Sequence, residues 1–417
     1  MNNALNYLSK NYCPIFDSVS KKPLQGIHRY KQLIVNNLLF DFSNFLHFFS
    51  IFANMFKQKN NQMGFVDNYV ERRIRKNTFF KRINMLVDWK AIEKEINKVY
   101  KRGHSVDGRP AYSGLLLFKM LLLGMWYDLS DEKVEESVNE NLSMMCFCDL
   151  DIEDNVPDHS VLSRFRSELT EKRAFDRLLK KINRQLVDHK VIIRNGAGIV
   201  DATLTDTPRC PKGKAEYELA EDRKESDRSP EDIEKEEITM KLIKKQRPGV
   251  DTEARYLKKG KKLHFGYKKQ VLTDENGMQL SVHTTTANEH DSKGLQPCLE
   301  NQDEYLAVSS CYADKGYQVP DNVDFLKSPI KNRKVKNRIQ HKAYRNRPLT
   351  DWQKVYNRLI SKKRWVVERT FGGMRRWFRC GTARYVGLGK THTQHLLEAI
   401  AYNLYRAPGI IMSNCQK

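Results

Sequence analysis

The 417-residue sequence has little of what a secreted, disulfide-stabilised protein needs. Its eight cysteines are scattered, only Cys146 and Cys148 lie close together, and no C-x-x-C pair is present. This usage excludes a disulfide framework and favours a reducing, cytoplasmic compartment, because C-x-C alone is weak support for a metal site. The first residues also lack the charged segment and cleavage site of a signal peptide.

Long apolar runs of the membrane-spanning kind are missing as well. The phenylalanine-rich residues 38–56 are interrupted by polar side chains such as Asp41 and His47, so no membrane association is expected. Their apolar positions recur at steps of three and four, which predicts an amphipathic helix or sequence from an over-extended reading frame. We therefore interpret residues 1–62 as an atypical N-terminal extension, with Met55 and Met63 as alternative starts.

Acidic side chains are scarce in one part of a strongly basic chain. The sequence has 73 Lys and Arg against 51 Asp and Glu, a formal net charge of +22. Residues 331–380 alone hold seventeen Lys or Arg and only two acids, Asp351 and Glu368. A solvated surface would explain this run, but a track for a polyanion such as DNA explains it better.

Residues 64–195 are predicted to be helical. Residues 88–100 have apolar side chains at helical spacing, and residues 111–126 are apolar almost all round, as in a buried helix. A further helix starting near Asp158 is expected to turn Arg166 outward. Short helices of this kind are typical of a helix-turn-helix-like DNA-binding domain, and equally of a plain helical bundle.

From residue 196 the apolar pattern becomes alternating and predicts an α/β domain with a mixed sheet. The predicted elements are a strand over 196–206, a hairpin of strands 264–274 and 278–287 around Asn276-Gly277, a helix over 294–304, a strand over 305–313, and helices over 349–377 and 391–406.

We place this domain at residues 196–408 and interpret residues 409–417 as a tail. The charged residues 210–262 are interpreted as an insertion in the domain, because 210–250 is nearly neutral, with ten basic and eleven acidic side chains. A helix is predicted within it, over residues 231–245.

Three acidic residues stand out by their surroundings. Asp201 follows the buried pair Ile199-Val200, Asp314 follows the strand over 305–313, and Glu368 lies in the basic helix. Such carboxylates are costly unless paired or bound to a cation, and they would converge if the strands were neighbours under that helix. Oxygen ligands select Mg²⁺ or Mn²⁺, and two such ions can cleave a phosphodiester. Singly, each aspartate is more often a cap and the glutamate a surface ion pair.

Two neighbouring patterns support the acidic cluster. Gly316 is expected to let the backbone turn sharply away from Asp314. Ser361, Arg364, Glu368, Phe371 and Arg375 are spaced 3, 4, 3 and 4 residues apart and so share one face of the helix. An arginine there can hold a phosphate beside a metal-bound glutamate, although an arginine–glutamate surface ladder has the same spacing.

Six motifs carry a family resemblance: "GIVDAT", "HFGYK", "TTANEHD", "YADKGYQ", "VERTFGGMRRWF" and "TARYVGL". In this order they resemble the DDE transposases of bacterial insertion sequences, nearest to insertion-sequence family five and similar to family four. The likeness runs from about Gly64 to Pro408. It implies a ribonuclease-H-like catalytic core, preceded by an all-α N-terminal domain that contacts the terminal inverted repeats of the element.

The resemblance also implies the site and its chemistry. Asp201, Asp314 and Glu368 correspond to the catalytic carboxylates, which bind two Mg²⁺ ions, with Mn²⁺ as a substitute. Water nicks the end of the element, and the freed 3′-OH attacks target DNA without a covalent enzyme–DNA intermediate. The implied partners are the inverted repeats, target DNA and a second copy of the chain in a synaptic homodimer, at the nucleoid in the bacterial cytoplasm.

One family pattern, Y-x2-R-x3-E-x6-K, departs at two positions. Ser361 replaces the tyrosine, which removes an aromatic contact to DNA, and Arg375 replaces the lysine but keeps its charge. Arg364, Arg375, Arg376 and Lys315 are the expected DNA-binding residues. Trp365 and Trp377 suit base stacking, although core packing is the more common role for both.

Two other functions fit the residues. A catalytically inactive DNA-binding regulator or domesticated copy would use only the helical domain, and a nuclease acting on RNA or branched DNA would use the same acids. Asn288, His290 and Asp291 lie where the family motif falls and are interpreted as shaping a turn near the site, and not as metal ligands.

Overall fold

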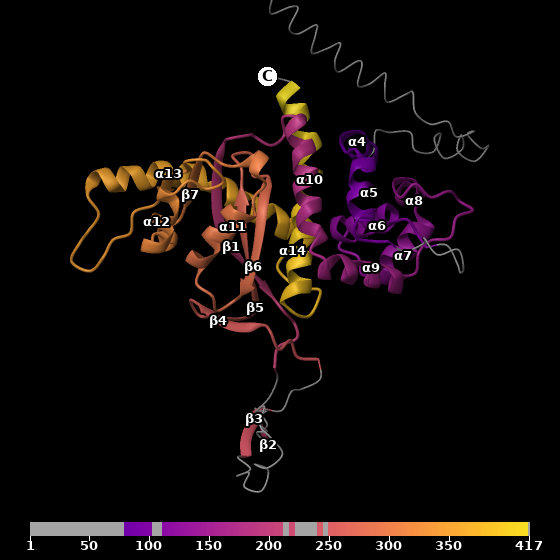
Figure 1. Cartoon of the computed structure of the whole chain (residues 1–417), viewed down its shortest axis with the longest axis horizontal. Coiled ribbons are helices and arrows are strands. Elements are labelled where there is room, and N and C mark those ends of the chain that lie inside the picture. Colours follow the sequence, from indigo (N-terminus) through magenta and orange to yellow (C-terminus); the bar gives the residue numbers. More distant parts are fainter. Residues whose placement is uncertain (1–78, 102–110, 212–216, 222–239, 245–248, 416–417) are drawn as a thin grey trace, which may run out of the picture. The chain divides into compact units, whose positions relative to one another are not determined.

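The computed structural model describes residues 79–101, 111–211, 217–221, 240–244 and 249–415 (Figure 1). The predicted N-terminal extension, 1–62, lies outside the described residues. The described residues belong to one compact unit, Asn68–Lys417. None of the helices in these ranges is long and apolar enough to cross a membrane.

The part of this unit that precedes the sheet is helical, as predicted. Its helices are α4 (Phe79–Leu86), α5 (Trp89–Asn97), α6 (Gly114–Trp126), α7 (Asp131–Glu140), α8 (Leu142–Phe147), α9 (His159–Glu171) and α10 (Ala174–Asp188). Asp88 caps α5 by accepting a hydrogen bond from the Ala91 N–H, and Ser130 caps α7 in the same way. Helix α6 is buried along nearly its whole length, which its uniformly apolar sequence predicts.

Arg166 in α9 does not point outward, so that prediction was wrong. Its guanidinium donates hydrogen bonds of 2.9 and 2.8 Å to the two carboxylate oxygens of Asp131, and it lies 4.1 Å from the ring centre of Tyr385. Helical periodicity could not reveal this burial, because both partners belong to elements distant in sequence.

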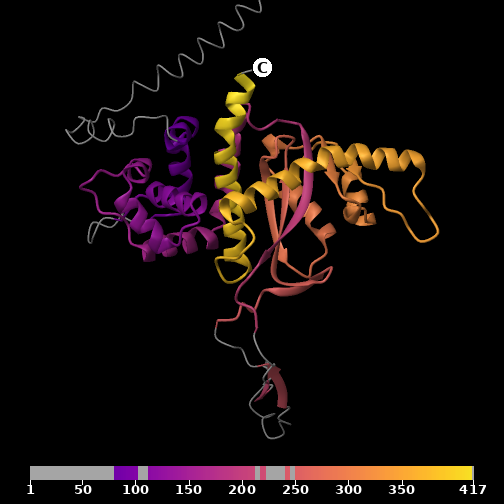
Figure 2. The same cartoon turned by 180° about the vertical axis from the view of Figure 1, so that it is seen from behind.

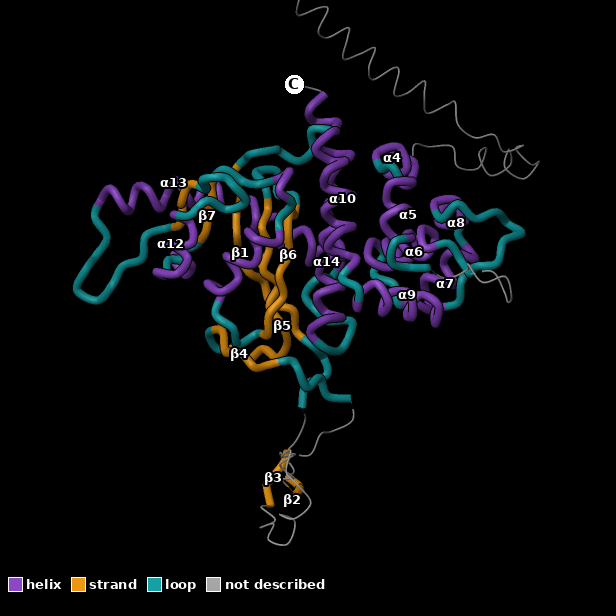
Figure 3. Tube along the Cα trace, viewed as in Figure 1, coloured by secondary structure: helices purple, strands orange, loops and turns teal. Residues whose placement is uncertain are grey.

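The region after α10 contains a six-stranded sheet (Figure 3). Its strands are β1 (Ala197–Asp206), β4 (Arg255–Lys259), β5 (Lys262–Thr273), β6 (Gln279–Thr286), β7 (Ser310–Ala313) and β8 (Lys336–Ile339). They run in the order β4-β5-β1-β7-β8, and β6 also pairs with β5. Strand β1 is antiparallel to β5 and parallel to β7, and β7 is parallel to β8. The predicted mixed sheet is therefore confirmed.

The predicted hairpin is confirmed as β5 and β6, and its turn requires a glycine. Gly277 has a φ angle of +83°, which L-residues rarely adopt. A Cβ atom there would also lie 2.6 Å from the Thr370 hydroxyl. The glycine is thus required both by the backbone conformation of the turn and by its close contact with the helix that contains Thr370.

The remaining elements connect and cover the strands. They are η2 (Asp291–Gly294), α11 (Leu295–Asn301), η3 (Glu304–Leu306), η4 (Lys315–Tyr317), α12 (Pro320–Lys327), α13 (Asp351–Phe378) and α14 (Leu388–Cys415). The strand expected over 305–313 starts only at Ser310, because a 3₁₀ turn precedes it. Helix α14 continues through Pro408 and takes in most of the predicted tail.

Within the charged insertion the structure describes β2 (Tyr217–Glu221) and β3 (Met240–Lys244), which pair antiparallel. The helix predicted over 231–245 was therefore wrong for residues 240–244, where pairing with β2 determines an extended backbone. The preceding part of that prediction, 231–239, lies outside the described ranges.

Helices cover both faces of the sheet, and alternate residues of β5 show how. Lys269 points to α14, where its ammonium lies 3.1 Å from the Glu398 carboxylate, and both side chains are buried. The next residue, Gln270, accepts a hydrogen bond from Tyr317 and packs against Gly294, just before α11. Successive strand residues point to opposite faces, so α14 and α11 lie on opposite sides of β5.

The "TARYVGL" motif joins the helical region to the sheet. The Ala383 N–H donates to the carbonyl of Asp206 at the end of β1. Arg384 donates to the carbonyls of Gly124 and Leu129 and to the Asp128 carboxylate, all around the end of α6. This motif therefore has a structural role that its sequence did not indicate.

Candidate active site

The sheet brings Asp201 and Asp314 to the same edge. Strands β1 and β7 are parallel neighbours, and their last registered pair is Ile199 with Tyr312. Each aspartate lies two residues beyond its member of that pair, so both are at the same level. The two strands are therefore neighbours, which was the condition for the two aspartates to converge.

Arg364 of α13 lies between the two carboxylates. One terminal nitrogen is 3.2 Å from Asp201 Oδ2, and the other is 3.6 Å from Asp314 Oδ1. The other oxygen of Asp201, Oδ1, accepts from the Ala202 N–H at 2.9 Å. Asp314 Oδ1, the oxygen that faces Arg364, also accepts from the Lys315 N–H at 2.7 Å. Asp314 thus also caps η4, the ordinary role of an aspartate at a strand end.

Burial dominates the electrostatics of Asp201. Desolvation raises the pKa of its carboxyl group above the usual value, although Arg364 and the Ala202 N–H act in the opposite direction. Repulsion from Asp314 and Asp291 adds to the rise. The ionised form of such a carboxylate is stabilised by a nearby cation, as the carboxylate of a metal ligand is.

Asp291 lies close enough to Asp201 to repel its carboxylate, as expected from the position of the "NEHD" segment after β6. Its carboxylate lies 2.8 Å from the ammonium of the buried Lys268. The turn predicted here is confirmed, since the His290 ring accepts from the Ser292 N–H and starts η2.

Glu368 lies on the side of α13 that faces β1. Four residues before it, Arg364 contacts Asp201, and seven residues after it, Arg375 donates to the Thr203 hydroxyl at 2.5 Å. Glu368 is exposed, and its carboxylate has no hydrogen bond or ion pair within the described ranges. Its oxygens do not join those of both aspartates within 4.8 Å, so the three acids are not drawn into one tight cluster.

Other predicted positions have mixed outcomes. Ser361 accepts a hydrogen bond of 2.7 Å from Gln340, which ties α13 to the segment after β8. Trp377 contacts Tyr402 and Tyr405 but is 39% exposed, so the core packing expected for it is only partial. Trp365 is half exposed and lies under Arg369, so core packing was the wrong expectation there.

The role expected for Gly316 was also wrong. Its φ angle is negative, and an added Cβ would meet no atom within 4 Å among the described residues. Tyr317 matters more in this motif, because it is buried below the site and donates a hydrogen bond of 3.2 Å to Gln270. Burial, with the nearby Asp201 and Asp291 carboxylates, raises the pKa of its hydroxyl well above the ordinary value.

The basic residues predicted to contact DNA occupy different surroundings. Lys315 and Arg375 are exposed beside the site, whereas Arg364 is mostly buried against the acids. Arg376 is exposed and lines a cavity of about 680 Å³ with Trp126 and Tyr405. Helix α13 crosses one face of the sheet and continues past its edge (Figure 2). The N-terminal half of this helix carries further exposed bases: Lys354, Arg358, Lys362 and Lys363.

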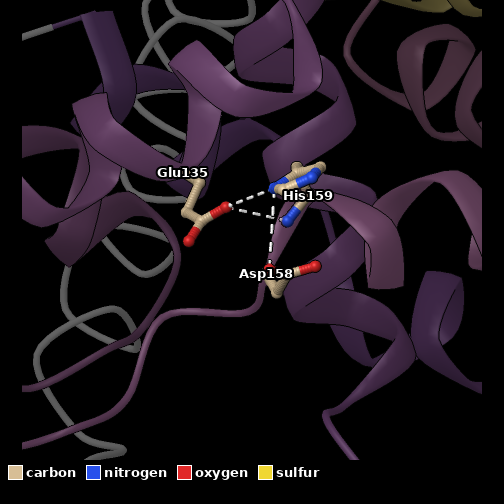
Figure 4. A group of neighbouring side chains, drawn as sticks. All are labelled: Glu135, Asp158 and His159. Carbon is tan, nitrogen blue, oxygen red and sulfur yellow. Dashed lines mark hydrogen bonds and ion pairs between the residues drawn. The ribbon is translucent and has the colours of Figure 1, made fainter.

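The described residues contain one tight group of three side chains with metal-ligand chemistry, Glu135, Asp158 and His159 (Figure 4). A Glu135 oxygen accepts from the His159 N–H at 2.9 Å and lies 3.0 Å from Nδ1 of the same residue. Asp158 caps α9 through the Ser160 N–H. These bonds join α7 to the start of α9, and the hydrogen bond of the His159 ring to the Glu135 carboxylate raises the pKa of His159. The contacts among these three side chains therefore serve to cap α9 and attach it to α7.

The mixed sheet, its flanking helices and the two aspartates on adjacent parallel strands define a ribonuclease-H-like nuclease core. Two family models match the chain, "Transposase domain (DUF772)" over residues 68–168 and "Transposase DDE domain" over residues 194–404. The chain belongs to the DDE transposase family.

A curated relative supports the same assignment. The chain is 35% identical over 245 residues to "Transposase for insertion sequence element IS1106" from Neisseria meningitidis serogroup B. The match covers 58% of this chain and 76% of that relative. The fold class and the family inferred from sequence motifs are confirmed, and the protein is an insertion-sequence transposase, a DNA-cleaving enzyme.

Proposed function

We propose that this transposase binds the terminal inverted repeats of its own element and cuts them with metal-dependent chemistry at Asp201, Asp314 and Glu368. The observation that carries the proposal is that Asp201 within β1 and Asp314 just after β7 lie at the same level of adjacent parallel strands and share one cationic partner. Two partly buried carboxylates that face the same guanidinium need positive charge between them.

The donor set fits divalent metal. All three proposed ligands are carboxylates, and oxygen-only ligands favour Mg²⁺ or Mn²⁺ over softer metals. Glu368 extends from the same helix face as Arg364 and has no competing partner within the described residues. Two such ions, when bound, would activate the attacking water and stabilise the leaving oxygen of the DNA backbone.

The chain's own residues would position the DNA. The exposed Lys315 and Arg375, together with Arg364, would offer donors suited to phosphate beside the acids, and the exposed Arg376 would contact DNA further along α13. The bases in the N-terminal half of α13 would extend this surface along the duplex. The helical region would read the inverted repeats, and a synaptic homodimer would hold both ends, at the bacterial nucleoid in the cytoplasm.

The test is nicking of a labelled duplex that carries the inverted repeat flanking this gene, in Mg²⁺ and in Mn²⁺. Asp201→Asn, Asp314→Asn and Glu368→Gln should each abolish nicking and later joining to target DNA, while DNA binding persists. Asp206→Asn is a matched control on the same strand, because Asp206 pairs with His264 instead of Arg364. Nicking that survives in the three variants would contradict the site assignment.

A catalytically inactive regulator is the second candidate, because Ser361 replaces the family tyrosine. It predicts that the wild-type protein binds the repeat and never cuts it in either metal. Glu368 lies on the same helix face as Arg364 and has no partner among the described residues, which favours the active enzyme.

A further inference from the structure

We infer that Arg364 is an exchangeable counterion, which neutralises Asp201 and Asp314 in the free protein and leaves them when a divalent cation binds. The inference rests on the proposed metal site and adds a dependence of metal binding on DNA. It begins from the position of one guanidinium that contacts both proposed ligands, at 3.2 and 3.6 Å.

The contacts of Arg364 are loose for a buried arginine. Charge-assisted hydrogen bonds of this type are usually about 2.7–2.9 Å long. Arg166 shows what a structural arginine looks like in this protein, since it binds Asp131 through two bonds of 2.9 and 2.8 Å. Arg364 instead divides its nitrogens between two carboxylates, at longer distances.

One donor of Arg364 is also unsatisfied. Its Nε atom is buried and has no hydrogen-bond partner among the described residues, although the side chain is only 12% exposed. A buried donor without a partner is costly, so this arrangement is not a fully satisfied resting place for the side chain. A phosphate could use the planar donors of a guanidinium better than the two separate carboxylates do.

A metal and the guanidinium would compete for the same oxygens. A divalent cation bound to both aspartates would lie close to the terminal nitrogens of Arg364, where like charges repel strongly at low dielectric. Binding of either cation therefore weakens the other. If Arg364 binds a DNA phosphate, the aspartates lose their counterion and bind metal more tightly. By thermodynamic linkage, bound metal then strengthens DNA binding by the same factor.

The experiment measures Mn²⁺ binding to the full chain, from the spectroscopic signal of free Mn²⁺, with and without the inverted-repeat duplex. Without DNA, Arg364→Gln should bind Mn²⁺ about tenfold more tightly than wild type, since one nearby charge shifts such equilibria by about that factor. Adding DNA should tighten binding to the wild type and change the variant little.

Two further variants separate charge at the site from general effects. Lys327→Gln removes an exposed positive charge of α12, which pairs with Asp324, and should leave Mn²⁺ affinity unchanged. Arg364→Lys keeps the charge and should retain an affinity near that of wild type, which also guards against a folding defect in the glutamine variant.

Equal or weaker Mn²⁺ binding by a folded Arg364→Gln would overturn the inference, because the arginine would then be holding the ligands in place. Asp314→Asn in the Arg364→Gln background distinguishes this failure from failure of the proposed function. If that substitution leaves Mn²⁺ binding unchanged, the metal does not bind at these acids, and the proposed site itself is wrong.

Discussion

Arg384 should contribute strongly to stability, because it connects the sheet region to the end of α6. Arg384→Ala removes bonds to two backbone carbonyls and to Asp128. The Gly124 carbonyl keeps a bond from the Leu129 N–H, so the Leu129 carbonyl is the group left without a partner. An unsatisfied carbonyl and the lost charge-assisted bond together predict a loss of about 2–3 kcal/mol in the free energy of unfolding.

Arg379 provides a matched control, because it pairs with the same carboxylate from the surface. Its guanidinium lies 3.2 Å from Asp128 and is 82% exposed, whereas Arg384 is 22% exposed. Exposed ion pairs contribute about 0–1 kcal/mol, so Arg379→Ala should have a small effect. Urea unfolding followed by tryptophan fluorescence compares the two variants. Equal losses would refute the structural role assigned to the "TARYVGL" motif.

Three further predictions concern the interior. Glu398→Ala leaves the Lys269 ammonium buried and unpaired and should cost about 3–5 kcal/mol, whereas the double variant Lys269→Met with Glu398→Leu should recover part of the loss in urea unfolding. Gly277→Ala should cost about 2 kcal/mol because of its positive φ angle, while Gly316→Ala should change the melting temperature little. Burial raises the pKa of Asp274 to about 7, from 3.8, so its stabilising effect should be full below about pH 4 and disappear as pH rises through 7. Asp274→Asn should flatten that part of the stability–pH curve, and an unchanged slope would contradict the shift.

Sequence patterns predicted the elements that depend on local signals. The hairpin at Asn276-Gly277, the buried helix α6 and the long helix α13 all have strong periodicity or turn chemistry, and the structure confirms them. The predictions that were wrong concern residues whose structure depends on partners distant in sequence. Arg166 is buried because it binds Asp131 and packs on Tyr385, and β3 is extended because β2 pairs with it.

The candidate site was predictable in part for the same reason. The positions of Asp201 and Asp314 just after apolar runs can be read from the sequence, and their proximity follows once the strands are parallel neighbours. The bridging position of Arg364 could not be predicted, because helix spacing gives the residues that share a face and not the atoms that the face meets. Glu368 lies on the predicted face, but its distance from the aspartates depends on tertiary packing.

The position of bound Mn²⁺, located by anomalous X-ray diffraction from crystals of the protein with its DNA end, is the sharpest test of the proposed metal site. We expect a peak between the Asp201 and Asp314 carboxylates, with Glu368 as a further ligand and Arg364 withdrawn from both aspartates. A peak only at Glu135, Asp158 and His159, or none beside Asp201 at saturating Mn²⁺, would contradict it.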